Sequence, residues 1–293
     1  MKMKWFAVAL SALLMISGCQ KETVEPPVDQ PQQENEQQEL TSTYTNLNDE
    51  ESRTLLQGLM DQAGISRESQ DVLFEHIDQV NGIMAEEQLT RGFEERPVLE
   101  PKYNAYDLAD QWNEKYPDFL GYCCRITAFS LFHEFMTIDE NIPVDENAVM
   151  MDMMALESDP RAFPDDLREY QGFYSPVQTT MTQDINTHVQ TLQEAWKDRG
   201  ISFNGNEYAS LISVVFHNDI DDPSVLDIGH TGILFDDGEQ LYFLEKLAFQ
   251  EPYQLIRIKD RAELEAIMMA RYDVSYNQPT ASPFIMENDQ LMK

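Results

Sequence analysis

The sequence predicts an α+β protein in which a helical N-terminal half packs on a four-stranded antiparallel sheet. Apolar residues recur at helical spacing in several segments before Gly200, whereas β-rich runs separated by Asp, Gly and Pro follow it. Helices first and strands afterwards are typical of α+β proteins rather than of alternating α/β folds. With 42% hydrophobic and 10% aromatic residues, the 293-residue chain has enough apolar area for a core.

The chain divides into four predicted parts. We expect a lipoprotein signal peptide over residues 1–18, a lipid anchor and disordered acidic linker over 19–45, a single α+β domain over 46–275 and a loose tail over 276–293. No internal repeat is evident.

The N-terminal segment has the pattern of an export signal. Lys2 and Lys4 precede the apolar run 5–16, which is too short to cross the ~30 Å hydrocarbon core of a bilayer as a stable helix. Residues 16–19, Ile-Ser-Gly-Cys, resemble the bacterial lipobox. That resemblance implies that Cys19 is diacylated, which would anchor the protein to the outer face of the cell membrane.

A polar spacer follows this segment. Residues 20–39 include six Gln, five Glu and three Pro, and such a composition cannot bury enough apolar area to offset the entropy lost on ordering. We therefore expect a flexible linker between the anchor and the domain.

Capping residues and apolar spacing delimit the expected helices. The second helix is expected to begin after Ser66 and to end before Gly82, and the last begins at Asp260 and ends near Arg271. The other helices are expected over 49–63, 105–113, 124–136 and 184–199, with further helical structure between 145 and 200.

Four β-rich runs predict a meander. Each is rich in branched or aromatic residues and is bounded by turn residues. The runs are Leu211–Phe216, Leu226–Phe235, Leu241–Leu247 and Tyr253–Lys259.

Charge and cysteine content exclude several classes of protein. With 53 Asp and Glu against 20 Lys and Arg, the formal charge is −33, which repels phosphate backbones, so we expect no nucleic-acid partner. Three cysteines are too few for a disulfide scaffold, and a bridge between the adjacent Cys123 and Cys124 would be badly strained. The core must therefore be held together by packing.

Cys124 is the candidate nucleophile. The segment 121–128 runs from a turn into an apolar helix, and Cys124 is in helical phase with the apolar Ala128 and Leu131. A thiol at a helix N-terminus feels the positive end of the helix dipole and unpaired amide donors. Both lower its pKa and supply part of an oxyanion hole.

His230 and Glu245 are the candidate base and orienting carboxylate. Asp237-Gly238 is a favoured pair for a two-residue hairpin loop, and such a loop places His230 directly opposite Glu245. Directly opposed side chains are close enough for a carboxylate to orient an imidazole ring. A bulge would shift the register and make Gln250 or Glu251 the partner instead.

This order of Cys, His and acid resembles the papain-like cysteine hydrolases, and among them the NlpC-type cell-wall peptidases. Their nucleophile heads a helix packed on an antiparallel sheet, and their base lies on a following strand. The resemblance implies Cys124, His230 and Glu245 as nucleophile, base and orienting residue. The chain departs from that pattern at the two neighbours of the nucleophile, Cys123 and Arg125.

A second resemblance covers more of the chain. The run Cys-Arg-Ile-Thr-Ala-Phe over 124–129 and the segments 229–233 and 243–246 are similar to signature segments of the domain of unknown function 4300, a group of Gram-positive lipoproteins. It covers about residues 45 to 272 and implies no substrate.

Other polar residues are weaker candidates. Arg125 either binds a substrate carboxylate or pairs with a local acid. The remaining histidines lie at no common ligand spacing, so we expect no metal site, and no cofactor motif is present. Loop residues 218–227 are acidic enough for calcium but lack the EF-hand spacing.

These features predict an anchored extracytoplasmic hydrolase of amide bonds, with cell-wall peptides as the candidate substrate and the lipid bilayer as a partner through acylated Cys19. The alternatives are a surface lipoprotein that uses the same scaffold as a non-catalytic binding module, and a transglutaminase-like ligase, which would use the same residues.

Overall fold

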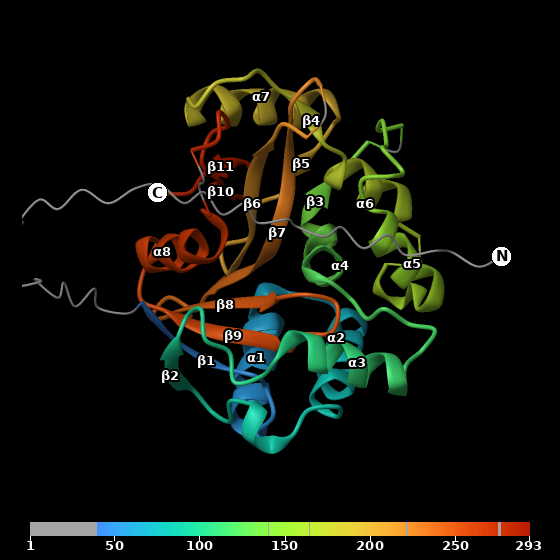
Figure 1. Ribbon diagram of the computed structural model, residues 1–293, viewed down its shortest axis with the longest axis vertical. Helices are drawn as coiled ribbons and strands as arrows, with labels where there is room; N and C mark the ends of the chain where they lie inside the picture. The colour runs from blue at the N-terminus through green and yellow to red at the C-terminus, as the bar shows by residue number, and fades with distance from the viewer. Residues whose placement is uncertain (1–39, 140, 164, 221, 275–276) are drawn as a thin grey trace, which may run out of the picture. The chain divides into compact units, whose positions relative to one another are not determined.

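A strongly twisted antiparallel sheet organises the fold, in the strand order β11-β10-β6-β7-β8-β9-β1-β2, with β4 paired to β7. The structure is a computed structural model that describes residues 40–293 except 140, 164, 221 and 275–276. In Figure 1, β6 and β7 rise steeply while β8 and β9 run nearly across them. The fold is α+β, as predicted, but the sheet has nine strands rather than four.

The strands of the large sheet include the predicted meander of β6 to β9. They are β1 (Thr41–Thr45), β2 (Glu94–Pro97), β4 (Val177–Gln178), β6 (Ala209–Asn218), β7 (Val225–Asp236), β8 (Leu241–Lys246), β9 (Tyr253–Ile258), β10 (Phe284–Glu287) and β11 (Gln290–Leu291). A separate pair is formed by β3 (Met136–Thr137) and β5 (Ser202–Phe203).

Eight α-helices surround the sheet in the described part of the chain. They are α1 (Glu50–Ala63), α2 (Arg67–Asn81), α3 (Ala105–Lys115), α4 (Cys124–Phe132), α5 (Met150–Ser158), α6 (Leu167–Tyr174), α7 (Ile185–Asp198) and α8 (Arg261–Tyr272). Short 3₁₀ turns lie at Glu86–Gln88, His133–Phe135 and Pro160–Ala162.

The predicted helix caps are largely confirmed. Ser66 and Asp260 accept backbone hydrogen bonds at the starts of α2 and α8, as expected. Helix α1 is capped by Asp49, and α4, expected to reach residue 136, ends at Phe132 before a 3₁₀ turn. The side-chain oxygens of these caps satisfy amide donors that have no partner inside the helix.

Two predicted domain boundaries are corrected. Residues 41–45, expected to belong to the linker, form β1 between β2 and β9. The tail 276–293, expected to be loose, contributes β10, which pairs with β6, and β11. Both strands depend on pairing with distant segments, so their own sequences carry little signal. The signal peptide, Cys19 and the linker up to residue 39 lie outside the described residues.

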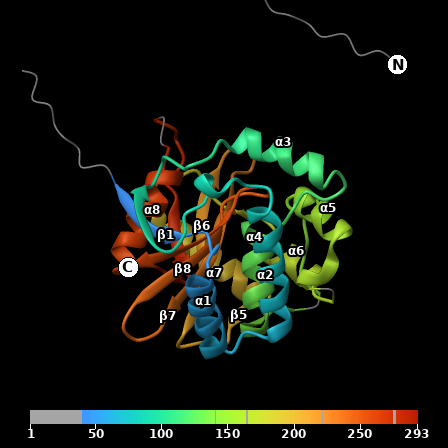
Figure 2. The same ribbon diagram turned by 90° about the horizontal axis from the view of Figure 1, so that it is seen from below.

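The sheet separates two apolar clusters. Helices α1, α2 and α4 to α7 contribute to the larger cluster, which includes Phe129, Ile233 and Leu255. Helix α8 covers the other face, where Leu264 and Ile267 meet residues of β6 to β9. Figure 2 shows α1, α2 and α4 together on one side, with α8 apart from them. The sheet is therefore buried on both faces.

A bulge in β7 changes which side chains face α8. The register against β6 shifts so that Val214 pairs with His230 and Val215 with Ile228, which leaves Gly229 as an extra residue. In a regular strand, Ile228 and His230 would share a face because they are two residues apart and strand side chains alternate. The bulge instead turns Ile228 toward the larger core and His230 toward α8.

The predicted hairpin register is wrong by two residues. The loop between β7 and β8 spans 237–240, so Glu245 pairs with Gly232 rather than with His230. A shift of one residue would have moved Glu245 to the other face, whereas a shift of two keeps it on the face of His230. The predicted neighbours therefore still meet, as diagonal partners.

Candidate functional site

The local backbone places Cys124 at the first position of α4. Gly121 adopts a φ of +87°, and a Cβ there would collide with the carbonyl oxygen of Phe249, so this turn requires glycine. Cys123 is the extended N-cap residue, with φ −99° and ψ −177°. The Cys124 thiol thus lies beside the unpaired amides of a helix N-terminus, and the residue is 7% exposed.

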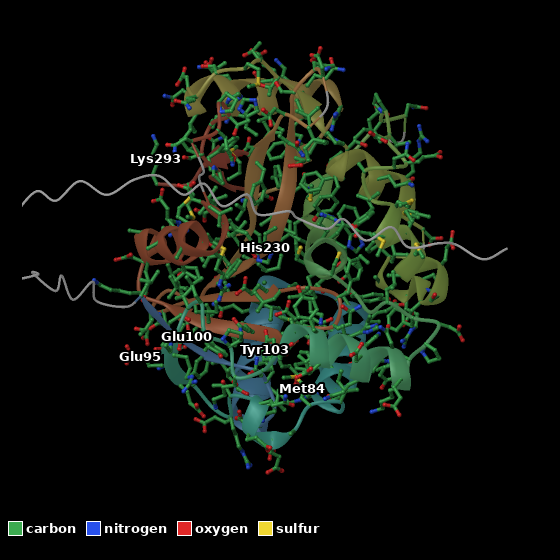
Figure 3. The ribbon with its side chains drawn as sticks, in the orientation of Figure 1. Met84, Glu95, Glu100, Tyr103, His230 and Lys293 are labelled. Carbon is green, nitrogen blue, oxygen red and sulfur yellow. The ribbon has the colours of Figure 1, made fainter. Side chains whose placement is uncertain are left out.

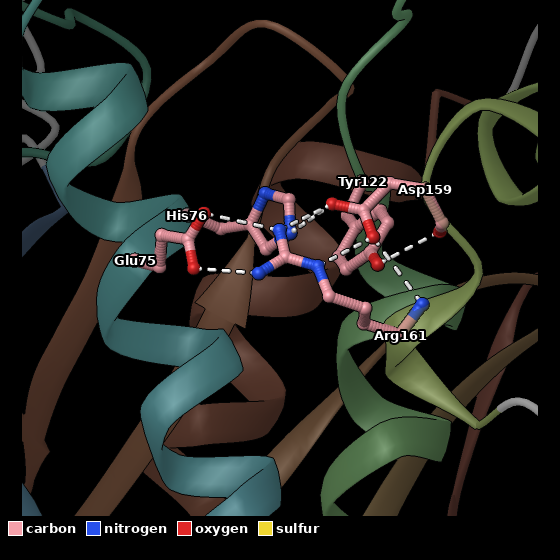
Figure 4. Close-up of polar contacts among 5 residues, drawn as sticks. All are labelled: Glu75, His76, Tyr122, Asp159 and Arg161. Atoms are coloured by element: carbon pink, nitrogen blue, oxygen red, sulfur yellow. Dashed lines mark hydrogen bonds and ion pairs between the residues drawn. The ribbon is translucent and has the colours of Figure 1, made fainter.

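A polar network holds the segment before the cysteines (Figure 4). The Tyr122 hydroxyl donates to the Asp159 carbonyl oxygen at 2.9 Å, and its ring packs 3.9 Å from that of His76. Arg161 donates to Asp159 and to Glu75 of α2, with shortest distances of 2.6 Å to each. This network ties α2 to the loop that leads into α4.

His230 and Glu245 form a buried hydrogen-bonded pair. His230 Nε2 lies 2.7 Å from Glu245 Oε2, and each residue is only 1% exposed. Gly232 lies directly opposite Glu245 and can be only glycine there, because a Cβ would collide with the Phe243 ring and the Leu244 carbonyl oxygen. In Figure 3 the His230 label lies between α8 and α4.

The imidazole of His230 also contacts the candidate nucleophile. The Cys124 sulfur and the His230 ring are close enough for each to shift the pKa of the other, and His230 is hydrogen-bonded to Glu245, so the three predicted residues form one cluster. The ladder between β7 and β8 ends at Gly232 and Glu245, and His230 lies two residues beyond it. Helix α4 packs against β7 and β8, which brings Cys124 to this part of the strand.

Helix α8 supplies two site residues that the sequence analysis missed. Arg271 Nη1 donates to Glu245 Oε1, and Nη2 donates to Gln254 at 3.3 Å. The Tyr272 ring stacks on His230 with a centroid distance of 4.9 Å and an angle of 25°. The only sequence signal was their place in the last turn of a predicted helix, since the face of α8 that meets the sheet depends on tertiary packing.

These contacts produce opposite charges on Cys124 and His230. A hydrogen bond from the Cys123 thiol lowers the pKa of Cys124 well below its usual value, and His230 acts in the same direction against the effect of burial. Burial alone would lower the pKa of His230, but its hydrogen bonds to Cys124 and Glu245 raise it to about 9. These shifts favour the pair of a Cys124 thiolate and a His230 imidazolium over the neutral pair.

Glu245 remains ionised despite complete burial. Burial raises the pKa of a carboxyl group, but the charge of Arg271 and the hydrogen bond to His230 outweigh it and lower the pKa of Glu245 to about 2. The carboxylate can then hold one ring orientation and stabilise the imidazolium.

Arg125 is engaged in a local ion pair. Its guanidinium donates to both carboxylate oxygens of Asp152, at 2.7 and 2.8 Å, and the Tyr170 hydroxyl donates to the same carboxylate at 2.5 Å. This is the second of the two roles left open for Arg125, and it joins α4 to α5 and α6. The substrate-binding role stays a prediction.

The two alternative orienting residues have other partners. The Gln250 amide donates to the Leu120 carbonyl oxygen at 3.0 Å, and the Tyr103 hydroxyl donates to Glu251 at 2.8 Å. Neither forms the contact with His230 that Glu245 makes, although the β6–β7 ladder contains a bulge. The bulge lies on the far side of His230 from the hairpin loop.

Among the described residues, no group of three or more His, Cys, Asp or Glu side chains could hold a metal ion. Within the same residues, no helix is both long and apolar enough to span a bilayer.

Comparison with known proteins identifies the family. Residues 43–292 match the family described as Domain of unknown function (DUF4300). The chain belongs to this family. No curated protein and no solved structure matches it. The assembled Cys124, His230 and Glu245 all lie within the matched DUF4300 residues.

The charge state of the site predicts how the thiol titrates. Thiolate absorbance of the wild type, measured against Cys124→Ser, should persist at pH 7 and disappear on acidification well below the usual thiol pKa of about 8.5. Cys123 should not contribute because burial raises its pKa. His230→Asn should move the midpoint upward, since the cation is lost. A midpoint near the usual value in the wild type would contradict the thiolate assignment.

The buried ion pair predicts a large stability effect at Arg271. Arg271→Met should lower the free energy of unfolding by about 3–5 kcal/mol in urea denaturation at pH 7, because it removes one of the two cations that pair with the buried Glu245 carboxylate. Adding Glu245→Gln should recover part of that loss. The control is Arg257→Met, an exposed arginine 4.4 Å from the Phe93 ring, with an expected cost of about 1 kcal/mol or less. Equal effects of Arg271→Met and Arg257→Met would contradict the role assigned to Arg271.

Proposed function

We propose that this DUF4300 protein is an extracytoplasmic, lipid-anchored cysteine hydrolase of amide bonds. The observation that carries the proposal is the continuous contact of Cys124, His230 and Glu245, with the thiol at a helix N-terminus. Nucleophile, base and orienting group in hydrogen-bond reach are the general signature of covalent thiol catalysis.

The arrangement also supports a papain-like organisation. A helix headed by the nucleophile packs on an antiparallel sheet, the base lies on β7 and the orienting residue on β8. This matches the order and placement expected from the resemblance to NlpC-type peptidases. The long segment between Cys124 and His230 holds α5, α6 and α7, which would be an insertion relative to those enzymes.

Each residue has a defined part in the proposed reaction. The Cys124 thiolate attacks the amide carbonyl, and its own backbone N–H donates to the developing oxyanion. The His230 imidazolium gives its proton to the leaving amine, so that a thioester to Cys124 remains. His230 then takes a proton from water, the hydroxide attacks the thioester, and the acid and the free thiolate are released.

The supporting residues keep this geometry in place. Glu245 would hold the imidazole through its short hydrogen bond, and Arg271 would hold Glu245. Tyr272 stacked on the ring restricts its rotation and excludes water from one face. Because Arg271 and Tyr272 touch no reacting atom in this scheme, they are positioning residues.

The charge of the chain bears on the substrate. At −33 the protein repels anionic polymers over long range, so it favours neutral or cationic ligand segments. Peptides of the cell wall, with their amide bonds and amino groups, are the substrate class we propose.

Burial of the site favours a second candidate function. Cys124 is 7% exposed and His230 1%, so the thiol is covered by packed side chains to a degree that suits a scaffold used only for binding. In that case the triad would be a structural ion-pair chain in a non-catalytic surface lipoprotein. The two candidates differ in whether a reagent or substrate reaches the thiol.

Purified muropeptides test the catalytic proposal. The wild type should release free amino groups, and Cys124→Ala and His230→Ala should each lower the rate by about 10⁴-fold because the nucleophile or its base is lost. Glu245→Gln should retain more activity than either, since the thiol and imidazole remain. Arg257→Ala, at an exposed position, serves as the matched surface control and should keep the wild-type rate.

Alkylation distinguishes the two candidates when no hydrolysis is seen. In the catalytic case, iodoacetamide should modify Cys124 at neutral pH faster than it modifies a free peptide thiol, because the group is a thiolate. A native rate at or below that of the peptide would exclude an activated, reachable nucleophile and would support the binding scaffold.

The anchor is tested separately from the chemistry. Cells that express the full chain in the presence of a labelled fatty acid should incorporate the label, and the protein should sediment with membranes. Cys19→Ala should lose both properties because the lipobox thiol is the acceptor, whereas Cys123→Ala should retain both. Equal labelling of Cys19→Ala and wild type would contradict the lipoprotein proposal.

A further inference from the structure

A second thiol lies next to the proposed nucleophile and has no part in the hydrolytic scheme. Cys123 and Cys124 are adjacent, both are free, and they are 4% and 7% exposed. Because the two residues are consecutive, their sulfur atoms lie within reach of each other, and the ionisation of each thiol shifts the pKa of the other. Cys123 is therefore placed to react with any group formed on Cys124.

The surroundings favour an anionic sulfur. Lys246, fully buried on β8, donates through Nζ to the Glu251 carbonyl oxygen and lies 4.7 Å from the centre of the Tyr253 ring. Burial lowers the pKa of Lys246 to about 7, so its ammonium is only partly protonated near neutral pH, and the imidazolium of His230 is the cation that lowers the pKa of Cys124. Thiolates in electropositive sites beside a second thiol are the ones that peroxides oxidise selectively.

We propose that Cys123 and Cys124 form a reversible oxidation site, in which a hydroperoxide oxidises Cys124 and Cys123 resolves the product as a Cys123–Cys124 disulfide. The site takes small hydroperoxides, because so little of Cys124 is exposed. It does not depend on amide hydrolysis, since the chemistry needs only the two sulfur atoms.

The reaction balances in two steps. The Cys124 thiolate attacks the terminal peroxide oxygen, the O–O bond breaks, and Cys124 sulfenic acid and an alcohol or water form once the alkoxide or hydroxide takes a proton. The Cys123 sulfur then attacks the Cys124 sulfur, the S–O bond breaks, and water leaves with the Cys123 proton. Overall, two thiols lose two electrons and two protons, and the peroxide is reduced.

Chain geometry makes this disulfide easy to reverse. Neighbouring Cα atoms are about 3.8 Å apart across a trans peptide, below the range of about 4.4–6.8 Å that disulfides usually span. A bridge between adjacent residues is therefore strained, and strained bridges are the labile, regulatory kind. A dithiol reductant would restore both thiols.

Formation of the disulfide would protect Cys124 from irreversible oxidation. A lone sulfenic acid can proceed to sulfinic acid, which dithiols do not reverse. Capture by Cys123 stops the sequence one step earlier and withdraws the Cys124 sulfur from nucleophilic chemistry until a reductant acts. Cys123 would thus protect the thiol that it also helps to keep ionised.

Mass spectrometry of the peroxide-treated full chain tests the proposal. After hydrogen peroxide treatment and thiol blocking, the tryptic peptide Tyr116–Arg125, which contains both cysteines, should appear with the loss of two hydrogens and without a blocking group. Dithiothreitol should return it to the doubly blocked form. Cys19 lies in a different peptide and does not interfere.

Single substitutions supply the controls. Cys123→Ser should instead gain one and then two oxygen atoms on Cys124. Cys123→Ala is a second variant for the same measurement, in case one of the two fails to fold. Cys124→Ser should gain no oxygen at Cys123 at the same peroxide dose, because that thiol stays protonated. Oxygen gain on wild-type Cys124 equal to that of the Cys123 variants would overturn the proposal, as would an unmodified wild-type peptide.

Discussion

A carboxylate buried without any solvent contact, Glu245, sets the charges at the centre of this protein. An isolated buried charge costs several kcal/mol, so it must be matched by cations and hydrogen bonds. Arg271 supplies one cation and His230 the other. The imidazolium in turn stabilises a thiolate at Cys124. The electrostatic effect of one buried carboxylate on β8 thus extends through His230 on β7 to the thiol at the N-terminus of α4.

Two separate parts of the fold hold these charged residues in place. The bulge at Gly229 turns His230 toward α8, where Tyr272 stacks on it. On the other side, the network around Tyr122 and Asp159 holds the loop that leads into α4. The proposed hydrolase and the proposed oxidation site therefore share one rigid framework, and they differ in which atoms around the Cys124 sulfur take part.

Much of the site was predictable because strand side chains alternate, so a register error of two residues leaves the same side chains on the same face. The β7–β8 hairpin was predicted two residues out of register, yet Glu245 and His230 share a face in either register. Cys124 was recognisable as a helix start from the turn before it. Arg271 and Tyr272 were not recognisable, because no local pattern reports which distant strand a helix covers. Strands 41–45 and 284–287 escaped prediction because they are formed by pairing with remote segments.

By itself, the sequence determined the α+β class, the starts of the main helices, the four central strands and the three residues that meet at the site. These features follow from short-range spacing and capping, which act within a few residues. Only the tertiary structure decided the nine-strand order, the bulge and the partner of Arg125. Those depend on which surfaces come together when buried charges and apolar faces must all be satisfied at once.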